Sequence, residues 1–185
     1  RIRMAEELRA AHEAGSVRVA IGRAAELYGA GVRLTLFGEQ VFRAALAGKT
    51  IHGTGDLGAP HAQSYIDDVA RGLATLGEHD EAFGEVWHLP VAPAISQREF
   101  ITLVYEEAGH DGWIGRLPRL SRRISALLNP MVRELMELDY QYERAFEVDS
   151  GKFARAFGVV ATPYREGIRR TVARCRPAPG VTSPA

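Results

Sequence analysis

The residues most suggestive of a nucleotide phosphate site in this 185-residue chain are the glycines from Gly53 to Gly58, which read GTGDLG. In a dinucleotide site, a G-x-G-x-x-G run directly follows a strand and opens a helix whose first amides bind the pyrophosphate. Here Ala59, Pro60 and His61 follow, and no helical period begins before Asp68. The run therefore predicts a turn between two extended segments and no phosphate site.

Metal binding and nucleophilic catalysis are not supported by the spacing of the residues that could perform them. The six histidines form no H-E-x-x-H or H-x-x-x-H pattern and have no cysteine pair beside them. No G-x-S-x-G motif occurs. The single cysteine, Cys175, falls on an apolar helical stripe and is expected to be a small core residue. We therefore predict that the chain has no metal site.

The acidic pair Asp67-Asp68 precedes an apolar repeat, and the residues alone leave two roles open. Aspartate at a helix N-terminus caps the first amides and interacts favourably with the helix dipole. Alternatively, Tyr65 and the pair line a cleft at strand ends, where open α/β sheets bind ligands. The segment from Tyr28 to Gly31 (YGAG) is a second loop expected after a strand, and its glycines would allow a sharp turn or a close ligand.

The elements that must position these residues alternate along the chain. The run VRVAI from Val17 to Ile21 predicts a strand buried on both faces, and Val86 to Leu89 predicts another. A short third strand is expected at Phe146 and Val148. Apolar periodicity and end signals predict helices over residues 1–14, 36–46, 68–76, 97–108, 120–127, 131–138, 153–157 and 163–175.

Several helix ends carry explicit capping signals. Ser96 and Glu99 form a capping box, Thr162-Pro163 predicts an N-cap followed by proline, and Gly77 and Gly158 are expected to end helices. In contrast, the expected first helix begins with Arg-Ile-Arg, which offers no cap. Because a strand buried on both faces also needs neighbours, we expect the chain to be the later part of a longer protein.

Composition places the chain among ordinary globular domains. It is 46% hydrophobic and 25% charged, with zero formal net charge, so no overall field favours nucleic acid or an anionic membrane. No apolar run approaches the roughly 20 residues of a membrane span. A lone cysteine fits a reducing compartment, and we expect a cytoplasmic protein. Residues 1–176 are expected to form the ordered part and residues 177–185, with three prolines, a flexible tail.

Four segments resemble the extended short-chain dehydrogenase/reductases, that is, the NAD-dependent epimerase/dehydratase family. They are VRVAIGRAAELYGAG from residue 17, SYIDDVARGL from residue 64, EVWHLP from residue 85 and VDSGKFARAFGVVATPYREGIRRTV from residue 148. Each is weak alone, but the four in family order and spacing are specific and cover nearly the whole chain. The resemblance implies an α/β protein: the later part of a Rossmann-like parallel sheet plus a mainly helical C-terminal substrate lobe.

The resemblance also implies which residues meet the cofactor, NAD or NADP. Arg23, Ala24, Ala25 and Tyr28 would border its nicotinamide end. The family pattern R-P-x-N-x-Y-G-P-G reads R-A-A-E-L-Y-G-A-G here, so Ala24 replaces a proline. The glycine fingerprint that binds the pyrophosphate is expected upstream of the first residue.

By the same resemblance, Glu26, Val41, His61 and Tyr65 would face a small-molecule substrate. Glu26 replaces the family's substrate-binding asparagine, and His61 stands where nucleotide-sugar enzymes often carry an arginine for the diphosphate. Histidine is mostly neutral at pH 7 and binds anions less well than arginine does. The expected substrate is therefore a small molecule other than a nucleotide sugar.

Catalysis in the family uses a Y-x-x-x-K dyad. The tyrosine is expected upstream of Arg1, and alignment puts the lysine near Ile2 or Arg3, where no lysine occurs. Arg3 is the candidate substitute, although its planar guanidinium is not an equivalent donor. The leading hypothesis is an NAD(P)-dependent epimerase, dehydratase or reductase-like enzyme. The alternatives are a catalytically silent NAD(P)-binding sensor or scaffold and, less favoured, a stand-alone interaction domain.

The late helical stretch could also serve assembly. Met131, Met136, Tyr140 and Tyr142 could form a homodimer contact or belong to the core, and the core is favoured.

Overall fold

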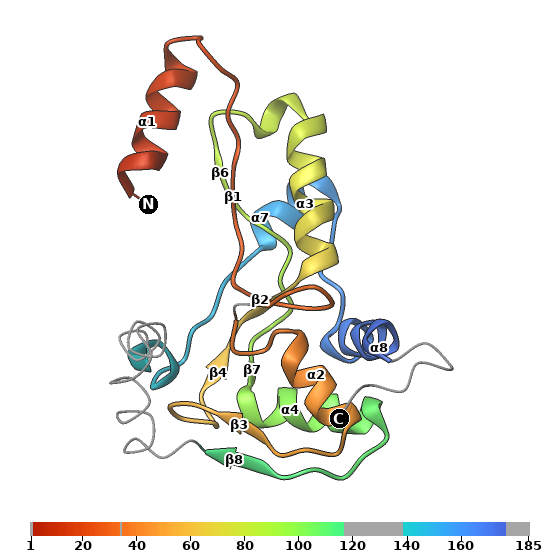
Figure 1. Cartoon of the computed structure of the whole chain (residues 1–185). Coiled ribbons are helices and arrows are strands. Elements are labelled where there is room, and N and C mark those ends of the chain that lie inside the picture. Colours follow the sequence, from red (N-terminus) through yellow and green to blue (C-terminus); the bar gives the residue numbers. More distant parts are fainter. Residues whose placement is uncertain (1, 34, 117–138, 177–185) are drawn as a thin grey trace.

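The computed structural model describes residues 2–33, 35–116 and 139–176 and confirms an α/β fold (Figure 1). Its strands are β1 (Ile21–Arg23), β2 (Glu26–Tyr28), β3 (Ile51–Gly53), β4 (Pro60–His61), β5 (Gln63–Tyr65), β6 (Val86–His88), β7 (Ile95–Ser96) and β8 (Ile114–Arg116). Its helices are α1 (Ile2–Glu13), α2 (Glu39–Leu46), α3 (Ile66–Glu78), α4 (Gln97–Ala108), α7 (Gly151–Phe157) and α8 (Tyr164–Cys175), with 3-10 turns η1 (Asp80–Ala82) and η2 (Asp139–Tyr142).

The described strands form four pairs. β1 pairs with β6, β2 with β5 and β3 with β8, all in parallel, whereas β4 and β7 are antiparallel. Each parallel pair is connected by a segment that contains at least one helix, as parallel strands require. In Figure 1, α3 and α7 lie beside the β1–β6 pair, and α2, α4 and α8 lie at the other end of the molecule.

The first predicted strand is displaced, and its two-sided burial is not seen. β1 begins at Ile21, the last residue of the predicted run, and Val17 is 46% exposed. The chain already runs beside β6 at Val19, whose carbonyl accepts from Gly84 N at 2.7 Å. The face of β1 that carries Gly22 packs on Leu73 of α3 and on Leu89.

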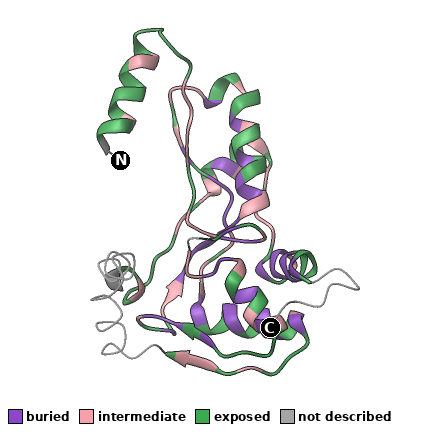
Figure 2. Ribbon diagram, in the orientation of Figure 1, coloured by how far each residue is buried: buried purple, intermediate pink, exposed green. Residues whose placement is uncertain are grey.

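Helix α1 is present as predicted, but its apolar residues are not buried by the described chain. Met4 is 58% and Leu8 40% exposed. Figures 1 and 2 show the helix standing apart from the rest, mostly exposed. Its C-terminal end contacts the body through His12, whose Nδ1 accepts from Val19 N at 3.4 Å.

The prediction that Asp67 or Asp68 caps the third helix is wrong. α3 begins at Ile66, directly after β5, and makes no side-chain cap hydrogen bond. It also continues through Gly77 to Glu78, because a helix tolerates an exposed glycine near its end at a modest cost. Asp68 instead lies buried in the first turn of α3 and binds a distant part of the chain.

That distant part is the start of the last helix, where a second prediction fails. Asp68 accepts hydrogen bonds from Thr162 N at 2.6 Å and Thr162 Oγ1 at 2.7 Å. Thr162 is therefore bound by Asp68 and does not cap α8, whose N-cap position is Pro163. Both failures have the same cause: the two side chains bond each other across 94 residues instead of capping the amides of their own helices.

Other local predictions are confirmed. Ser96 and Glu99 form a complete capping box on α4, and Gly158 ends α7 in the left-handed region. The glycine-rich run lies in a turn between β3 and β4. α2 begins at Glu39, later than the predicted Leu36, because the chain preceding it is held by non-helical bonds such as Glu39 N to Val32 O at 2.7 Å.

The core consists of two clusters. The larger gathers aromatic and aliphatic side chains from β2, β5, α2, α4 and α8, and includes Phe100 and Ile168 with Cys175, which is buried as predicted. The smaller packs α3, β6 and α7 around Trp87 and Phe153. In Figure 2 the buried residues, in purple, lie largely on the sides of α2, α4 and α8 that face one another.

Several predictions lie outside the described residues: the helices over residues 120–138, the assembly candidates Met131 and Met136, and the tail 177–185. At the predicted third strand, Phe146 forms an isolated parallel bridge with His61, and Val148 belongs to no strand. None of the helices described is long and apolar enough to cross a membrane.

Candidate functional site

The parallel pair β2–β5 and the end of β4 bring three polar side chains to one place. Glu26 of β2 is the register partner of Gln63 of β5, and paired residues in parallel strands project to the same face. His61 precedes Gln63 by two positions, and its Nε2 lies 3.5 Å from Glu26 Oε2. The structure therefore brings together two of the predicted substrate residues, Glu26 and His61.

Glu26 is held in place by two hydrogen bonds to Oε1. Leu36 N donates at 2.9 Å, and the hydroxyl of Tyr142 donates at 2.9 Å across 116 residues of sequence. The side chain of Glu26 is 14% exposed and that of His61 is 6% exposed. The carboxylate is thus largely removed from water and is oriented by groups from two other parts of the chain.

Burial sets the protonation behaviour of this group of side chains. It raises the pKa of Glu26 above its ordinary value, and the two hydrogen bonds partly oppose this rise. It lowers the pKa of His61, so the imidazole is neutral at neutral pH. Burial and the nearby carboxylate of Glu26 raise the pKa of Tyr142, which keeps its hydroxyl protonated and donating.

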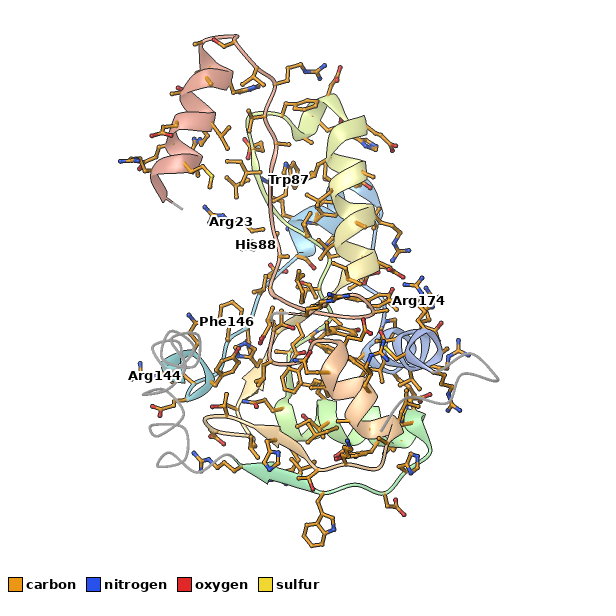
Figure 3. All side chains as sticks on the ribbon, viewed as in Figure 1. Arg23, Trp87, His88, Arg144, Phe146 and Arg174 are labelled. Atoms are coloured by element: carbon orange, nitrogen blue, oxygen red, sulfur yellow. The ribbon has the colours of Figure 1, made fainter. Side chains whose placement is uncertain are left out.

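An aromatic segment encloses His61. Its ring centroid lies 4.9 Å from that of Tyr142 and 5.1 Å from that of Phe146. Backbone hydrogen bonds fix the segment, because Ala62 N donates to Phe146 O at 2.8 Å and Phe146 N donates to Pro60 O at 2.9 Å. Figure 3 shows Phe146 and Arg144 on this segment, on the side of the molecule where η2 lies.

Some polar atoms of this group of side chains make no hydrogen bond with the described residues. Glu26 Oε2, His61 Nδ1 and both amide atoms of Gln63 are buried without a hydrogen-bond partner among the described residues. Gln63 is not among the residues predicted for the site, and Tyr142 is predicted to lie in the core or in a dimer contact. Strand alternation could have found Gln63, since residues 61, 63 and 65 recur at the period of two that marks one face. Nothing local to Tyr142 indicates its bond to Glu26.

The structure places the other two predicted substrate residues apart from this group. Val41 lies on α2, 7% exposed in the larger core cluster. Tyr65 is 2% exposed, its ring centroid lies 5.4 Å from that of Tyr28, and its hydroxyl donates to Asp67 at 2.8 Å. Asp67 in turn binds Arg174 of α8 (labelled in Figure 3), so this network joins α3 to α8.

The predicted cofactor residues divide into exposed and buried ones. Arg23 and Ala24 are exposed at the end of β1, where Arg23 is the register partner of His88 (Figure 3). Ala25 is fixed by its amide, which donates to Ser64 Oγ at 3.1 Å. Tyr28 is 1% exposed and packs in the core, where burial raises its pKa. Their contact with a cofactor stays a prediction.

Arg3, the candidate substitute for the dyad lysine, lies on the exposed helix α1. Its side chain is 91% exposed, and its Nε lies 3.3 Å from Glu7 Oε1 one helical turn away. Among the residues that the structure describes, no three histidine, cysteine, aspartate or glutamate side chains gather as a metal site would require.

No protein-family model matches the sequence, and no curated protein matches it. Solved structures do match its fold. UDP-glucuronic acid 4-epimerase from Bacillus cereus, solved with UDP-glucuronic acid and NAD, has a TM-score of 0.67 and 16% identity, covering 92% of this chain and 49% of that one. A double mutant of dTDP-glucose 4,6-dehydratase from Streptomyces venezuelae, with NAD bound, has a TM-score of 0.63 and 20% identity, covering 89% and 46%. RMD from Pseudomonas aeruginosa, complexed with NADPH, has a TM-score of 0.65 and 15% identity, covering 90% and 50%.

These likenesses concern the fold, since the identities are low. The chain spans about half the length of the solved structures that it matches. Their shared architecture confirms the resemblance found in the four sequence segments. The chain therefore has the Rossmann-like α/β fold seen in epimerases and dehydratases.

Proposed function

We propose that the chain is part of an NAD(P)-dependent epimerase, dehydratase or reductase that acts on a small molecule other than a nucleotide sugar. The observation that carries the proposal is the group formed by Glu26, His61 and Gln63. Glu26 and Gln63 are the first residues of β2 and β5, and Glu26 follows the carboxyl end of the parallel strand β1 by three residues. Open α/β sheets bind their ligands outside the carboxyl ends of their strands. The fold shared with cofactor-bound epimerases and dehydratases supports the same conclusion.

The residues at the end of β1 are compatible with a bound dinucleotide. Arg23 and Ala24 are exposed there, and the small side chain of Ala24 leaves the backbone approachable. The bond between Ala25 N and Ser64 Oγ holds this segment against β5. NAD(P), when bound, supplies the hydride-transfer chemistry, and these residues would position its nicotinamide end.

The charge around Glu26 argues against a nucleotide sugar. A diphosphate is best bound by arginine or lysine, yet among the described residues His61 is the basic group within ion-pair distance of Glu26. Burial keeps that histidine neutral at neutral pH by lowering its pKa. Glu26 itself would repel a nearby phosphate.

The test is a titration of the full-length protein with NAD(H) and with NADP(H), in which calorimetry or nicotinamide fluorescence measures binding. We expect saturable binding of one of the two pairs. Replacing Ala24 with Trp, which fills the approachable segment, should weaken binding about tenfold or more, while Ala74→Trp on the exposed side of α3 should not. Binding of neither cofactor would contradict the proposal.

A second candidate is a protein of the same fold that binds NAD(P) without turning it over. The observation that favours it is Arg3, which stands in place of the dyad lysine and pairs with Glu7 on an exposed helix. Cofactor binding together with an unchanged nicotinamide absorbance, over a panel of alcohols and carbonyl compounds, would favour this candidate over the enzyme. A cytoplasmic location stays a prediction of the sequence, and a homodimer stays an alternative that the sequence left open.

A further inference from the structure

Several buried polar atoms of β2, β4 and β5 have no hydrogen-bond partner among the described residues. Gln63 is 1% exposed, and neither its Oε1 nor its Nε2 has a partner among the described residues. Glu26 Oε2 and His61 Nδ1 share this condition. Buried polar atoms are nearly always paired in folded proteins, so such a group indicates a missing partner.

Two of the four atoms of this group that lack a partner among the described residues, Glu26 Oε2 and Gln63 Oε1, can only accept a hydrogen bond. Gln63 Nε2 only donates, and His61 Nδ1 donates or accepts according to its tautomer. Leu36 N and the Tyr142 hydroxyl both donate to Oε1, and His61 Nε2, 3.5 Å from Oε2, makes no hydrogen bond with it. Glu26 Oε2 is therefore left to receive a donor from elsewhere.

The charge of the group is negative or zero and never strongly positive at neutral pH. His61 is neutral, and the ion pairs of the described residues bring no arginine or lysine to Glu26. In a poorly solvated place, a second negative charge beside a carboxylate is strongly disfavoured.

We propose that Glu26, His61 and Gln63 form a subsite for a hydrogen-bond-donating group of the substrate, a hydroxyl or an ammonium, and that this subsite rejects carboxylate and phosphate groups. The inference rests on the proposed function and specifies its substrate class. Glu26 is the residue that determines the preference, Tyr142 and Leu36 N orient its carboxylate, and Gln63 adds one acceptor and one donor.

The experiment uses four probes that share one ring and differ in charge: glucose, glucosamine, glucuronate and glucose 6-phosphate. Their dissociation constants are measured by ligand-observed NMR on the full-length protein, with and without saturating cofactor. We expect glucose and glucosamine to bind about tenfold or more tightly than the two anions. Glu26→Gln, which keeps the shape and the Oε1 acceptor, should remove most of that difference.

Glu166→Gln is the matched control, because Glu166 lies on the surface of α8 and pairs with Arg169 and Arg170. It should leave the preference unchanged. Equal or tighter binding of the anions, a preference that survives Glu26→Gln, or no binding of any probe would overturn the subsite. Failure to bind NAD(P) would contradict the proposed function alone, since the probes are also measured without cofactor.

Discussion

Asp68 shows how a single carboxylate can connect distant parts of this fold. It is 1% exposed on α3 and accepts from both the amide and the hydroxyl of Thr162. Arg71 reaches the same carboxylate from one turn further along the helix. Removing the Asp68 carboxylate takes away the acceptor of the Thr162 amide and of the Thr162 hydroxyl proton, and losing the partner of a buried donor is costly.

We predict that Asp68→Ala lowers the free energy of unfolding by about 3 kcal/mol, as measured by urea denaturation. The control is Asp80→Ala, because Asp80 has an 89% exposed side chain that pairs with Arg18 at the surface. Exposed pairs of this type contribute little. Equal losses in the two variants would contradict the role of Asp68.

The contribution of Glu26 to the stability of the fold should decrease as the pH rises. Because burial raises its folded pKa above 4.5, the folded state binds this proton more tightly than the unfolded state does. The stability it contributes is fully present below pH 4.5 and is lost as pH rises through the raised pKa. Glu26→Gln should therefore gain melting temperature relative to the natural protein as the pH is raised from 4.5 to neutral.

Glu166→Gln is the comparison, because the contribution of Glu166 to stability changes with pH in the opposite direction. Hydrogen bonds from Arg170 and Arg169 lower the pKa of Glu166, so its stability is present above the ordinary pKa and is lost as pH falls through the lowered one. This variant should lose melting temperature relative to the natural protein as the pH is raised toward 4.5 from below, and its difference from the natural protein should stay nearly constant from pH 4.5 to neutral. Parallel pH profiles for the two variants would show that Glu26 is not buried as described.

At the scale of elements, the close approach of α3 to the strands depends on glycine. A Cβ at Gly72 would lie 2.9 Å from Pro90 Cδ and 3.0 Å from Leu89 Cδ2, whereas a Cβ at Gly77 would have nothing within 4 Å. Both positions belong to α3. The helix therefore contains one glycine that packing requires and one that packing does not.

We predict opposite effects for the same substitution in this one helix. Gly72→Ala should lower the free energy of unfolding by about 1–2 kcal/mol, because Pro90 and Leu89 must move. Gly77→Ala should raise it by about 0.5–1 kcal/mol, because alanine loses less backbone entropy in a helix. Chemical denaturation measures both, and a loss at Gly77 or a gain at Gly72 would contradict the packing of α3.

At the scale of the whole molecule, the described residues form two core clusters with α1 outside both. Leu89 is 2% exposed in the smaller cluster, and Leu8 of α1 is 40% exposed. The two clusters adjoin at β2, where Tyr28 belongs to the larger cluster and Leu27 packs against the smaller one. The strand ends that form the candidate site therefore depend on both clusters.

Leu89→Ala should lower the free energy of unfolding by about 2–5 kcal/mol, because it leaves a cavity in a packed cluster. Leu8→Ala should change it by less than about 0.5 kcal/mol, as surface substitutions do. Thermal melting of the full-length protein checks both. A large loss from Leu8→Ala would mean that another segment or a second copy covers this face of α1.

The sequence by itself determined those features that depend on residues a few positions apart. The capping box of Ser96 and Glu99, the end of α7 at Gly158 and the buried stripe of α8 are confirmed, because each involves contacts within a helical turn or two. The four family-like segments likewise predicted the fold, since each keeps its local pattern of strand, loop and helix.

Only the tertiary structure decided which side chains make the candidate site. Glu26 and His61, both predicted from the resemblance to face a substrate, lie together, but Tyr142 reaches Glu26 across 116 residues, and Val41 and Tyr65 are taken into the core. Asp68 and Thr162 bind each other where the sequence indicated two separate caps. Local patterns describe neighbours along the chain, whereas such contacts arise only when packing brings distant segments together and burial demands a partner for each polar group.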